Sequence, residues 1–145
     1  MQIVDRASLK TVQMIHGLKA PYDALPLEDG SVLYAELATG RITRASGADY
    51  KTTKVVAEGL AGPTQMALGR DGALVVTEAA AARLTEIDPA SGTRRTIAAN
   101  LPIGLPAGPG MPPPYVVTGV AVGADGTVYV SANKNNAVYR LRPQR

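Results

Sequence analysis

Two glutamates occupy matching positions in the sequence, and carboxylates are among the groups that can carry chemistry. Glu36 and Glu78 each lie seven residues after the aspartate of an Asp-Gly pair. If the fold brought them together, their oxygens could bind a divalent cation such as Ca2+. They could also raise one another's pKa and act as acid and base, with the Tyr22 hydroxyl in the same catalytic site. The alternative is structural: each glutamate accepts hydrogen bonds in a turn, or pairs with the arginine five residues on, Arg41 or Arg83.

Other polar residues near the same points of the sequence are candidates for holding a small ligand. They are Asp23, Thr64, Gln65, Thr118 and Asn133. Hydroxyls, amides and carboxylates can orient a small polar molecule through directional hydrogen bonds. The same residue types also bond to backbone groups in turns, so a structural role is the alternative for each of them.

The remaining reactive residue types are scarce. The 145 residues include no cysteine and one histidine, His16, which excludes disulfides and thiol nucleophiles and leaves little for a serine–histidine–aspartate arrangement. The net charge is +3, without the clustered basic and aromatic residues of a nucleic-acid groove. No stretch approaches the roughly 20 apolar residues that span a bilayer. We expect no nucleic-acid or membrane partner, and a cytoplasmic location, or a periplasmic or secreted one if the chain is part of a longer precursor.

A repeat organises these residues. Three segments align without gaps: PYDALPLEDGSVLYAELATGRITR from Pro21, PTQMALGRDGALVVTEAAAARLTE from Pro63, and VTGVAVGADGTVYVSANKNNAVYR from Val117. Their Asp-Gly pairs are 42 and 54 residues apart. An Asp-Gly pair between apolar runs indicates a tight hairpin turn, because glycine tolerates a positive φ. Each unit therefore predicts four short strands, with the second strand at residues 31–36, 73–78 and 127–132.

Four short strands in a repeat of 42 residues are typical of a β-propeller blade. No segment has the helical periodicity that a parallel α/β fold requires between its strands. We predict an all-β half-propeller of three four-stranded blades. Its parts are a closing outer strand (1–18), blade 1 (19–60), blade 2 (61–101), an insertion loop (102–116) and a blade 3 without its outer strand (117–145).

The insertion LPIGLPAGPGMPPPY replaces a short turn before blade 3 and is rich in proline and glycine. Long loops in compact domains often serve as lids over a functional site. If this loop is a lid over the central channel of a propeller, Met111 and Tyr115 are the side chains expected to touch a ligand.

Three blades are too few to close a ring, since propellers typically contain about four to eight. An open arc exposes apolar faces and unpaired strand edges. We expect two copies to assemble head to tail into a six-bladed homodimer, in which residues 10–18 of each copy complete blade 3 of the other by strand exchange. The alternative is that the sequence is the C-terminal half of a longer chain, or a fragment.

The phrases GPTQMALGRDGALVVTE, VTGVAVGADGTVYVSANKNNAVYRL and EIDPASG resemble six-bladed propellers of the gluconolactonase/senescence-marker, strictosidine-synthase-like and NHL-repeat superfamily. Similar blades occur in ScyD/ScyE-like proteins and virginiamycin B lyase. The resemblance implies that a site lies at the mouth of the central channel. Gluconolactonase-type proteins take metal ligands from the start of the first strand, where this chain has Tyr22, Thr64 and Thr118. Lyase-type sites use a glutamate and two histidines, whereas this chain has His16 alone.

Two classes of function follow from these observations. The first is an oligomeric propeller module that binds a small ligand or serves as a scaffold. The second is a gluconolactonase-like hydrolase or lyase that acts on a small molecule and depends on a divalent cation. Blades of this kind serve both classes, so the architecture does not separate them.

Overall fold

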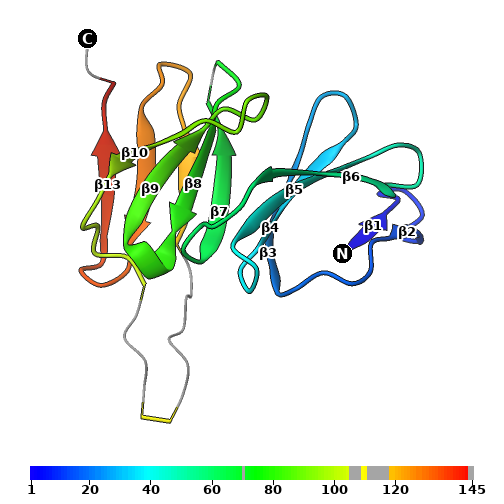
Figure 1. Cartoon of the computed structure of the whole chain (residues 1–145), viewed down its shortest axis with the longest axis horizontal. Helices are drawn as coiled ribbons and strands as arrows, with labels where there is room; N and C mark the ends of the chain where they lie inside the picture. The colour runs from blue at the N-terminus through cyan, green and yellow to red at the C-terminus, as the bar shows by residue number, and fades with distance from the viewer. Residues whose placement is uncertain (70, 105–108, 111–117, 144–145) are drawn as a thin grey trace.

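The computed structural model describes residues 1–69, 71–104, 109–110 and 118–143, which form antiparallel strands and one short 3-10 turn (Figure 1). The strands are grouped into one two-stranded, one three-stranded and two four-stranded sheets. The all-β class and the propeller-blade architecture predicted from the repeat are confirmed.

Blades 1 and 2 are four-stranded sheets whose strands follow one another in sequence order. Blade 1 comprises β3 (Pro21–Pro26), β4 (Val32–Glu36), β5 (Arg41–Ser46) and β6 (Thr52–Ala57). Blade 2 comprises β7 (Pro63–Leu68), β8 (Leu74–Glu78), β9 (Arg83–Ile87) and β10 (Arg94–Ala98), with the 3-10 turn η1 (Ala79–Ala81) between β8 and β9. The second strand of each sheet lies where the Asp-Gly spacing predicts it.

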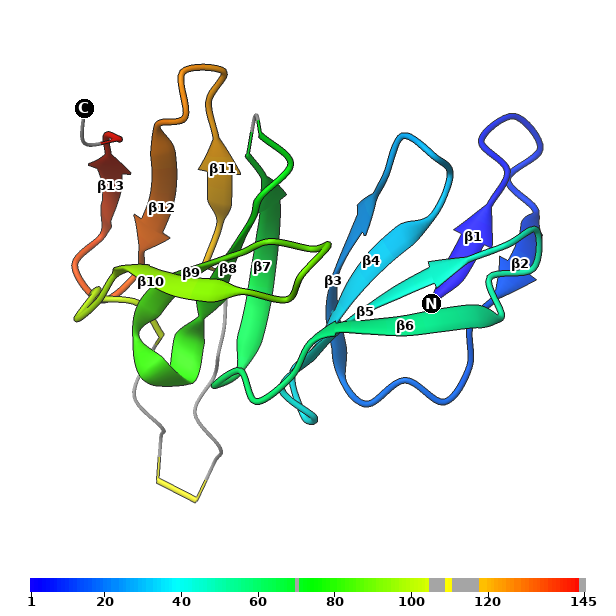
Figure 2. The same ribbon diagram turned by 45° about the horizontal axis from the view of Figure 1, so that its top comes forward.

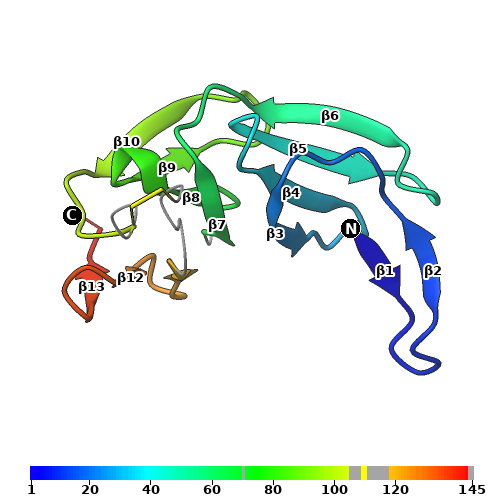
Figure 3. The same cartoon turned by 90° about the horizontal axis from the view of Figure 1, so that it is seen from below.

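Blade 3 has three strands, β11 (Val120–Val122), β12 (Val128–Ala132) and β13 (Ala137–Leu141). Within the described residues, β13 is hydrogen-bonded to β12 alone, so this sheet has an open outer edge. The two remaining strands, β1 (Gln2–Val4) and β2 (Thr11–Met14), form a hairpin of their own. This hairpin lies beside blade 1, on the side away from blade 2 (Figures 2 and 3).

The blades are arranged in an arc with their first strands on its inner side. β7 packs against β3 on one side and against β11 on the other. The outer strands β6 and β10 follow the convex side of the arc, while β3 and β7 lie toward its concave side (Figure 3). The first strands therefore share one inner wall, as they do around the channel of a propeller.

The core lies between neighbouring blades. Leu33 and Ile42 of blade 1 belong to one buried cluster with Leu74 and Ile87 of blade 2, and none of the four is more than 1% exposed. A second cluster joins the other face of blade 2 to blade 3 and includes Val75, Leu84, Val128 and Val130. Burial of such side chains stabilises the fold by about 1.5–3 kcal/mol each. Because blade 2 is apolar on both faces, it is stable only between two neighbours.

The segment that connects blade 1 to blade 2 is fixed at Gly40, in the turn between β4 and β5. The Leu60 N–H donates to the Gly40 carbonyl oxygen at 3.0 Å. Gly40 has a φ of +64°, and a Cβ there would lie 2.4 Å from the Leu60 carbonyl oxygen. Gly30, in an Asp-Gly turn, has a φ of +80° but no atom within 4 Å of its Cβ position.

We predict that Gly40→Ala lowers the free energy of unfolding by about 3 kcal/mol, because it adds a steric overlap to the cost of a left-handed φ. The matched control Gly30→Ala bears only the φ cost of about 1 kcal/mol. Urea unfolding followed by circular dichroism measures both. Equal losses in the two variants would contradict the role of Gly40 in holding the connection.

Candidate functional site

The candidate residues lie at one end of the blades, where each first strand begins and each second strand ends. In the strand pairing, Pro21 lies opposite Glu36, and Pro63 lies opposite Glu78. We call this the entry end. The β3–β4 and β11–β12 turns, which carry Asp-Gly pairs, lie at the opposite end (Figure 2).

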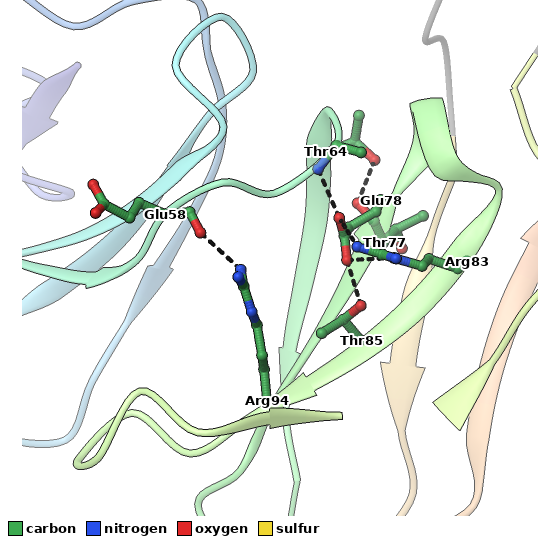
Figure 4. A network of polar contacts seen from close by, with 8 residues as sticks. Glu58, Thr64, Thr77, Glu78, Arg83, Thr85 and Arg94 are labelled. Atoms are coloured by element: carbon green, nitrogen blue, oxygen red, sulfur yellow. Dashed lines mark hydrogen bonds and ion pairs between the residues drawn. The ribbon is translucent and has the colours of Figure 1, made fainter. Parts of the chain in front are cut away.

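Glu78, the last residue of β8, is fully buried and its two carboxylate oxygens are both engaged (Figure 4). Oε2 accepts hydrogen bonds from the Ala61 N–H at 2.6 Å and from Arg83 Nη2 at 2.8 Å. Oε1 accepts from Arg83 Nε at 2.8 Å and from the Thr85 hydroxyl. The predicted pairing with Arg83 is confirmed; Thr85 and the backbone of Ala61 are partners that sequence reasoning missed.

These contacts determine the ionisation of Glu78. Burial raises the pKa of its carboxyl, but the hydrogen bonds from Arg83, Thr85 and Ala61, together with the charge of Arg83, outweigh burial and hold the pKa below its ordinary value. Glu78 is therefore an ionised anchor for the segment that enters β7. Such an arrangement matches the structural alternative for this residue.

Glu36 has the equivalent position in blade 1, and it too accepts a hydrogen bond from the backbone of the segment before the first strand. It is 8% exposed, and its Oε1 accepts the Lys19 N–H at 2.6 Å. Lys19 precedes Glu36 by 17 residues, as Ala61 precedes Glu78. Arg41 forms its ion pair with Glu58 at 3.4 Å, so the expected pairing with Glu36 is wrong for this blade. Blades 1 and 2 thus share one arrangement, in which a glutamate at the end of the second strand anchors the segment before the first strand of the same blade.

Asp23 joins the inner strands of blades 1 and 2. Its Oδ2 accepts the Met66 N–H of β7 at 2.7 Å, and its Oδ1 accepts the N–H of Ala24 at 2.9 Å. One carboxylate oxygen thus replaces a backbone acceptor across the blade boundary. The sequence shows no sign of this contact, because 43 residues separate Asp23 from Met66.

Two buried threonines join the inner strands of blades 2 and 3. Thr64 and Thr118 are 0% and 1% exposed, and their hydroxyl oxygens are 3.0 Å apart. The Thr64 hydroxyl also lies 3.4 Å from the carbonyl oxygen of Thr77, to which it can donate. The Thr77 hydroxyl is buried and has no hydrogen-bond partner among the described residues.

The other predicted residues differ in how far they reach the surface. Tyr22 of β3 is 36% exposed, while Gln65 of β7 and Asn133, directly after β12, are half-buried. The structure thus brings the residues that begin the first strands of all three blades to the entry end. His16 lies in the segment after β2 and is exposed. Met111 and Tyr115, predicted to touch a ligand, lie outside the described residues.

Within the described part of the chain, no three histidine, cysteine, aspartate or glutamate side chains are close enough to hold a metal ion together. A Ca2+ site at Glu36 and Glu78 would have to recruit oxygens from elsewhere, since both carboxylates already accept backbone hydrogen bonds. No helix in the residues described is long and apolar enough to cross a membrane.

This arrangement of blades and inner strands defines a β-propeller fold, and solved structures share it. The chain is similar to virginiamycin B lyase from Staphylococcus aureus, with a TM-score of 0.58, 16% identity, and 88% of this chain and 42% of that chain covered. It is similar to a gluconolactonase from Xanthomonas campestris, with a TM-score of 0.62, 17% identity, and 97% and 54% covered. It is also similar to an auxiliary nutrient binding protein from Bacteroides ovatus, with a TM-score of 0.63, 14% identity, and 90% and 30% covered.

At these identities the likeness shows the fold. The chain spans between 30% and 54% of the length of these three proteins. No protein-family model matches the sequence, and no curated protein matches it. The neighbours are the kinds of propeller that the repeat phrases resemble.

We predict that Glu78→Gln lowers the free energy of unfolding at neutral pH by about 3 kcal/mol, because Arg83 loses its charged partner. The matched control Glu36→Gln should cost about 1 kcal/mol, the worth of one backbone hydrogen bond. Urea unfolding measures both. A loss for Glu36→Gln as large as for Glu78→Gln would contradict the difference between the two anchors.

The same variant has a predicted pH dependence. Since the pKa of Glu78 is lowered in the folded state, its stabilisation is complete above the ordinary value of 4.5 and is lost as the pH falls through the lowered folded value. The gap in unfolding free energy between the wild type and Glu78→Gln should therefore be largest near neutral pH and shrink below about pH 4.5. A gap that is constant down to about pH 3 would contradict an ionised Glu78.

We predict that Thr77→Val raises the free energy of unfolding by about 1 kcal/mol, because it removes a buried hydroxyl without a protein partner at nearly constant volume. Thr64→Val, the control, should lower it by about 1 kcal/mol, since the hydroxyl of Thr118 loses its partner. Thermal unfolding measures both. Destabilisation by Thr77→Val would mean that a bound water satisfies that hydroxyl.

Proposed function

We propose that this chain is one half of a ring-shaped propeller that binds a small polar ligand at the entry end of its inner strands, and that a second copy supplies the other half. The observation that carries this proposal is the packing of β7 between β3 and β11. It brings the polar residues at the start of each first strand to one inner wall. Small molecules bind in concave sites that combine apolar walls with a few convergent polar groups.

Several contacts favour binding over catalysis. Glu36 and Glu78, the candidate catalytic carboxylates, each anchor a backbone N–H, and Glu78 is also paired with Arg83. An ionised carboxylate that is already fully bonded, such as that of Glu78, is a weak general acid or base. Tyr22 and Gln65 reach further toward the surface and can orient a ligand through a hydroxyl and an amide. The similar protein from Bacteroides ovatus is a nutrient binding protein.

The second candidate function is a hydrolase or lyase that depends on a divalent cation such as Ca2+. The similarity to a gluconolactonase and to virginiamycin B lyase favours it. In this case Tyr22, 36% exposed at the entry end, would be the group nearest to a substrate. Glu36 or Glu78 would complete the site by bonding the cation beside its backbone partner.

The similar propellers contain more chain than the part that this protein covers, so a ring of that kind needs further blades. The three similar proteins are about two to three times as long as the part that this chain covers, with coverages of 54%, 42% and 30%. Blade 3 also has an open edge and an open face, which a neighbouring blade would cover. Closed two-fold assemblies are the commonest way in which identical chains bury such surfaces.

The proposal is tested by thermal unfolding with glucono-1,5-lactone, glucose and Ca2+ as probes, beside light scattering of the same sample. We expect light scattering to give twice the mass of the chain. A probe at 100 times its dissociation constant should add about 2.7 kcal/mol to the free energy of unfolding. That gain should fall in Tyr22→Phe and Gln65→Ala and persist in Thr53→Ala, an exposed position on β6 away from the entry end.

The outcomes separate the two functions. No shift with any of the three probes would contradict this ligand class, and a mass of one chain would contradict the ring. Stoichiometric Ca2+ that is lost in Glu78→Gln, with turnover of the lactone, would favour the hydrolase.

A further inference from the structure

Blade 3 presents an open face whose residues occupy positions that are buried in the other blades. Tyr129 and Val138, four and thirteen residues after Asp125, are 40% and 69% exposed. The residues with the same spacing from the aspartates of the other Asp-Gly pairs are at most 2% exposed. They are Leu33 and Ile42 in blade 1 and Val75 and Leu84 in blade 2. The two exposed side chains therefore lie where a following blade packs.

A groove of about 980 Å3 lies between blades 2 and 3, at the end of the blades opposite to the entry end. Apolar and charged side chains both line it, the apolar ones including Ile97, Val128, Leu141 and Pro143, and the charged ones Asp71, Glu86, Arg95, Asp125 and Arg142. It runs beside the open edge of β13, where blades 1 and 2 have a fourth strand. Its walls thus belong to two blades and its open side faces the position of that strand.

The corresponding space between blades 1 and 2 is filled by the turn and strand that follow β9. A Cβ on Gly92, in that turn, would lie 3.3 Å from the Val56 carbonyl oxygen of β6. Arg94, the first residue of β10, donates from Nη1 to the Glu58 carbonyl oxygen at 2.7 Å. The element that fills the space is therefore a hairpin turn followed by an outer strand.

The N-terminal hairpin has the same turn. The Asp5 N–H donates to the Lys10 carbonyl oxygen at 2.9 Å, and the Leu9 N–H donates to the Asp5 carbonyl oxygen at 2.8 Å. The equivalent bonds after β9, from Asp88 to Thr93 and from Gly92 to Asp88, are 2.9 and 2.8 Å long. The first strand pair also matches, Val4 opposite Thr11 and Ile87 opposite Arg94.

Leu9 indicates that this turn meets another surface. It takes the position of Gly92 with a φ of +56°, a conformation that costs a leucine about 1–2 kcal/mol. Its side chain is 79% exposed. An exposed apolar side chain held in a left-handed turn is explained if it packs against the apolar side chains of such a groove.

We propose that the N-terminal hairpin of one copy docks into the groove between blades 2 and 3 of a second copy, so that residues 5–10 fill the groove and β2 becomes the fourth strand of the partner's blade. This inference rests on the proposed two-copy ring and names the elements that close it. The partner is a second copy because this chain itself carries the hairpin that repeats the groove-filling element of blade 2.

Docking requires β13 of the partner to displace β1 from β2. The reason is that β1 and β13 both correspond to β9, the third strand of blade 2, which pairs with the outer strand. Val4 of β1 has the position of Ile87 of β9, because Val4 pairs with Thr11 as Ile87 pairs with Arg94. Leu141 of β13 has this position too, because it pairs with Val128 as Ile87 pairs with Leu74. β1 has three residues and a register shift directly at Val4, whereas β13 has five residues. The longer strand offers β2 more hydrogen bonds than the one it replaces.

The test exploits the absence of cysteine from the sequence. In the docked register Val12 lies opposite Arg140 of the other copy, as Arg95 lies opposite Glu86 in blade 2. Opposed residues on antiparallel strands have Cα atoms about 4.5–5.5 Å apart, within reach of a disulfide. The double variant Val12→Cys with Arg140→Cys should form a disulfide-linked dimer on mild oxidation, seen on a non-reducing gel and lost on reduction.

The matched control is Lys54→Cys with Arg140→Cys. Lys54 has the position of Val12 on β6, but β6 is already paired with β5. Equal cross-linking of the two double variants, or none in the first, would overturn the docking.

A second measurement avoids cysteine. Val138→Glu should raise the dimer dissociation constant by roughly 100-fold, because the blade that follows blade 3 in the ring would bury an unpaired charge. Lys134→Glu, exposed in the same blade, should leave it unchanged. A wild-type monomer would overturn both the ring and the docking. A dimer that Val138→Glu weakens but that forms no specific cross-link would overturn the docking alone.

Discussion

The burial of one apolar blade face against the next is the interaction on which the rest of this structure depends. Leu33 and Ile42 lose their contact with water only because Leu74 and Ile87 of the following blade cover them. A single blade is a thin sheet with two such faces, and it has no interior of its own. At about 1.5–3 kcal/mol for each buried side chain, the contacts between blades supply most of the apolar stabilisation. Within the described residues, the arc ends in the β1–β2 hairpin on one side and in the open face of blade 3 on the other.

The polar contacts follow from this packing. Neighbouring blades can pack closely only if the connecting segment takes a fixed path, and its backbone N–H groups still need acceptors when they are buried. Glu36 and Glu78 provide these acceptors, and Arg83 compensates the buried charge of Glu78. Asp23 does the same for the Met66 N–H, and the hydroxyls of Thr64 and Thr118 bond to each other between the inner strands of blades 2 and 3. Residue types that are common in catalytic sites serve here to hold blades together.

The sequence predicts the parts of this fold that are local. Asp29-Gly30 and Asp71-Gly72 place hairpin turns because the turn chemistry is contained in two residues, and the strands on either side follow from their apolar runs. Contacts between blades cannot be predicted in this way, since spacing along the chain carries no information about them. The bond from Met66 to Asp23 is of this kind. The ion pair of Arg41 with Glu58 lies within blade 1, but spacing does not predict it either. The sequence therefore predicts which candidate residues share one end of the blades and the pair of Glu78 with Arg83, but not the partners that candidate residues have in neighbouring blades.

Blade 3 shows how far the anchoring scheme can change without loss of the blade. It has Ala132 where blades 1 and 2 have a glutamate, so it has no carboxylate at this position. Other contacts hold the start of the segment: the Lys134 N–H donates to the Pro102 carbonyl oxygen at 3.0 Å, and Ile103 is buried in the cluster between blades 2 and 3. An apolar side chain and a backbone bond here replace a buried charge, an exchange that is close to neutral in free energy when the packing is good. The glutamate is thus one solution to the connection between blades, whereas the apolar face is required in every blade.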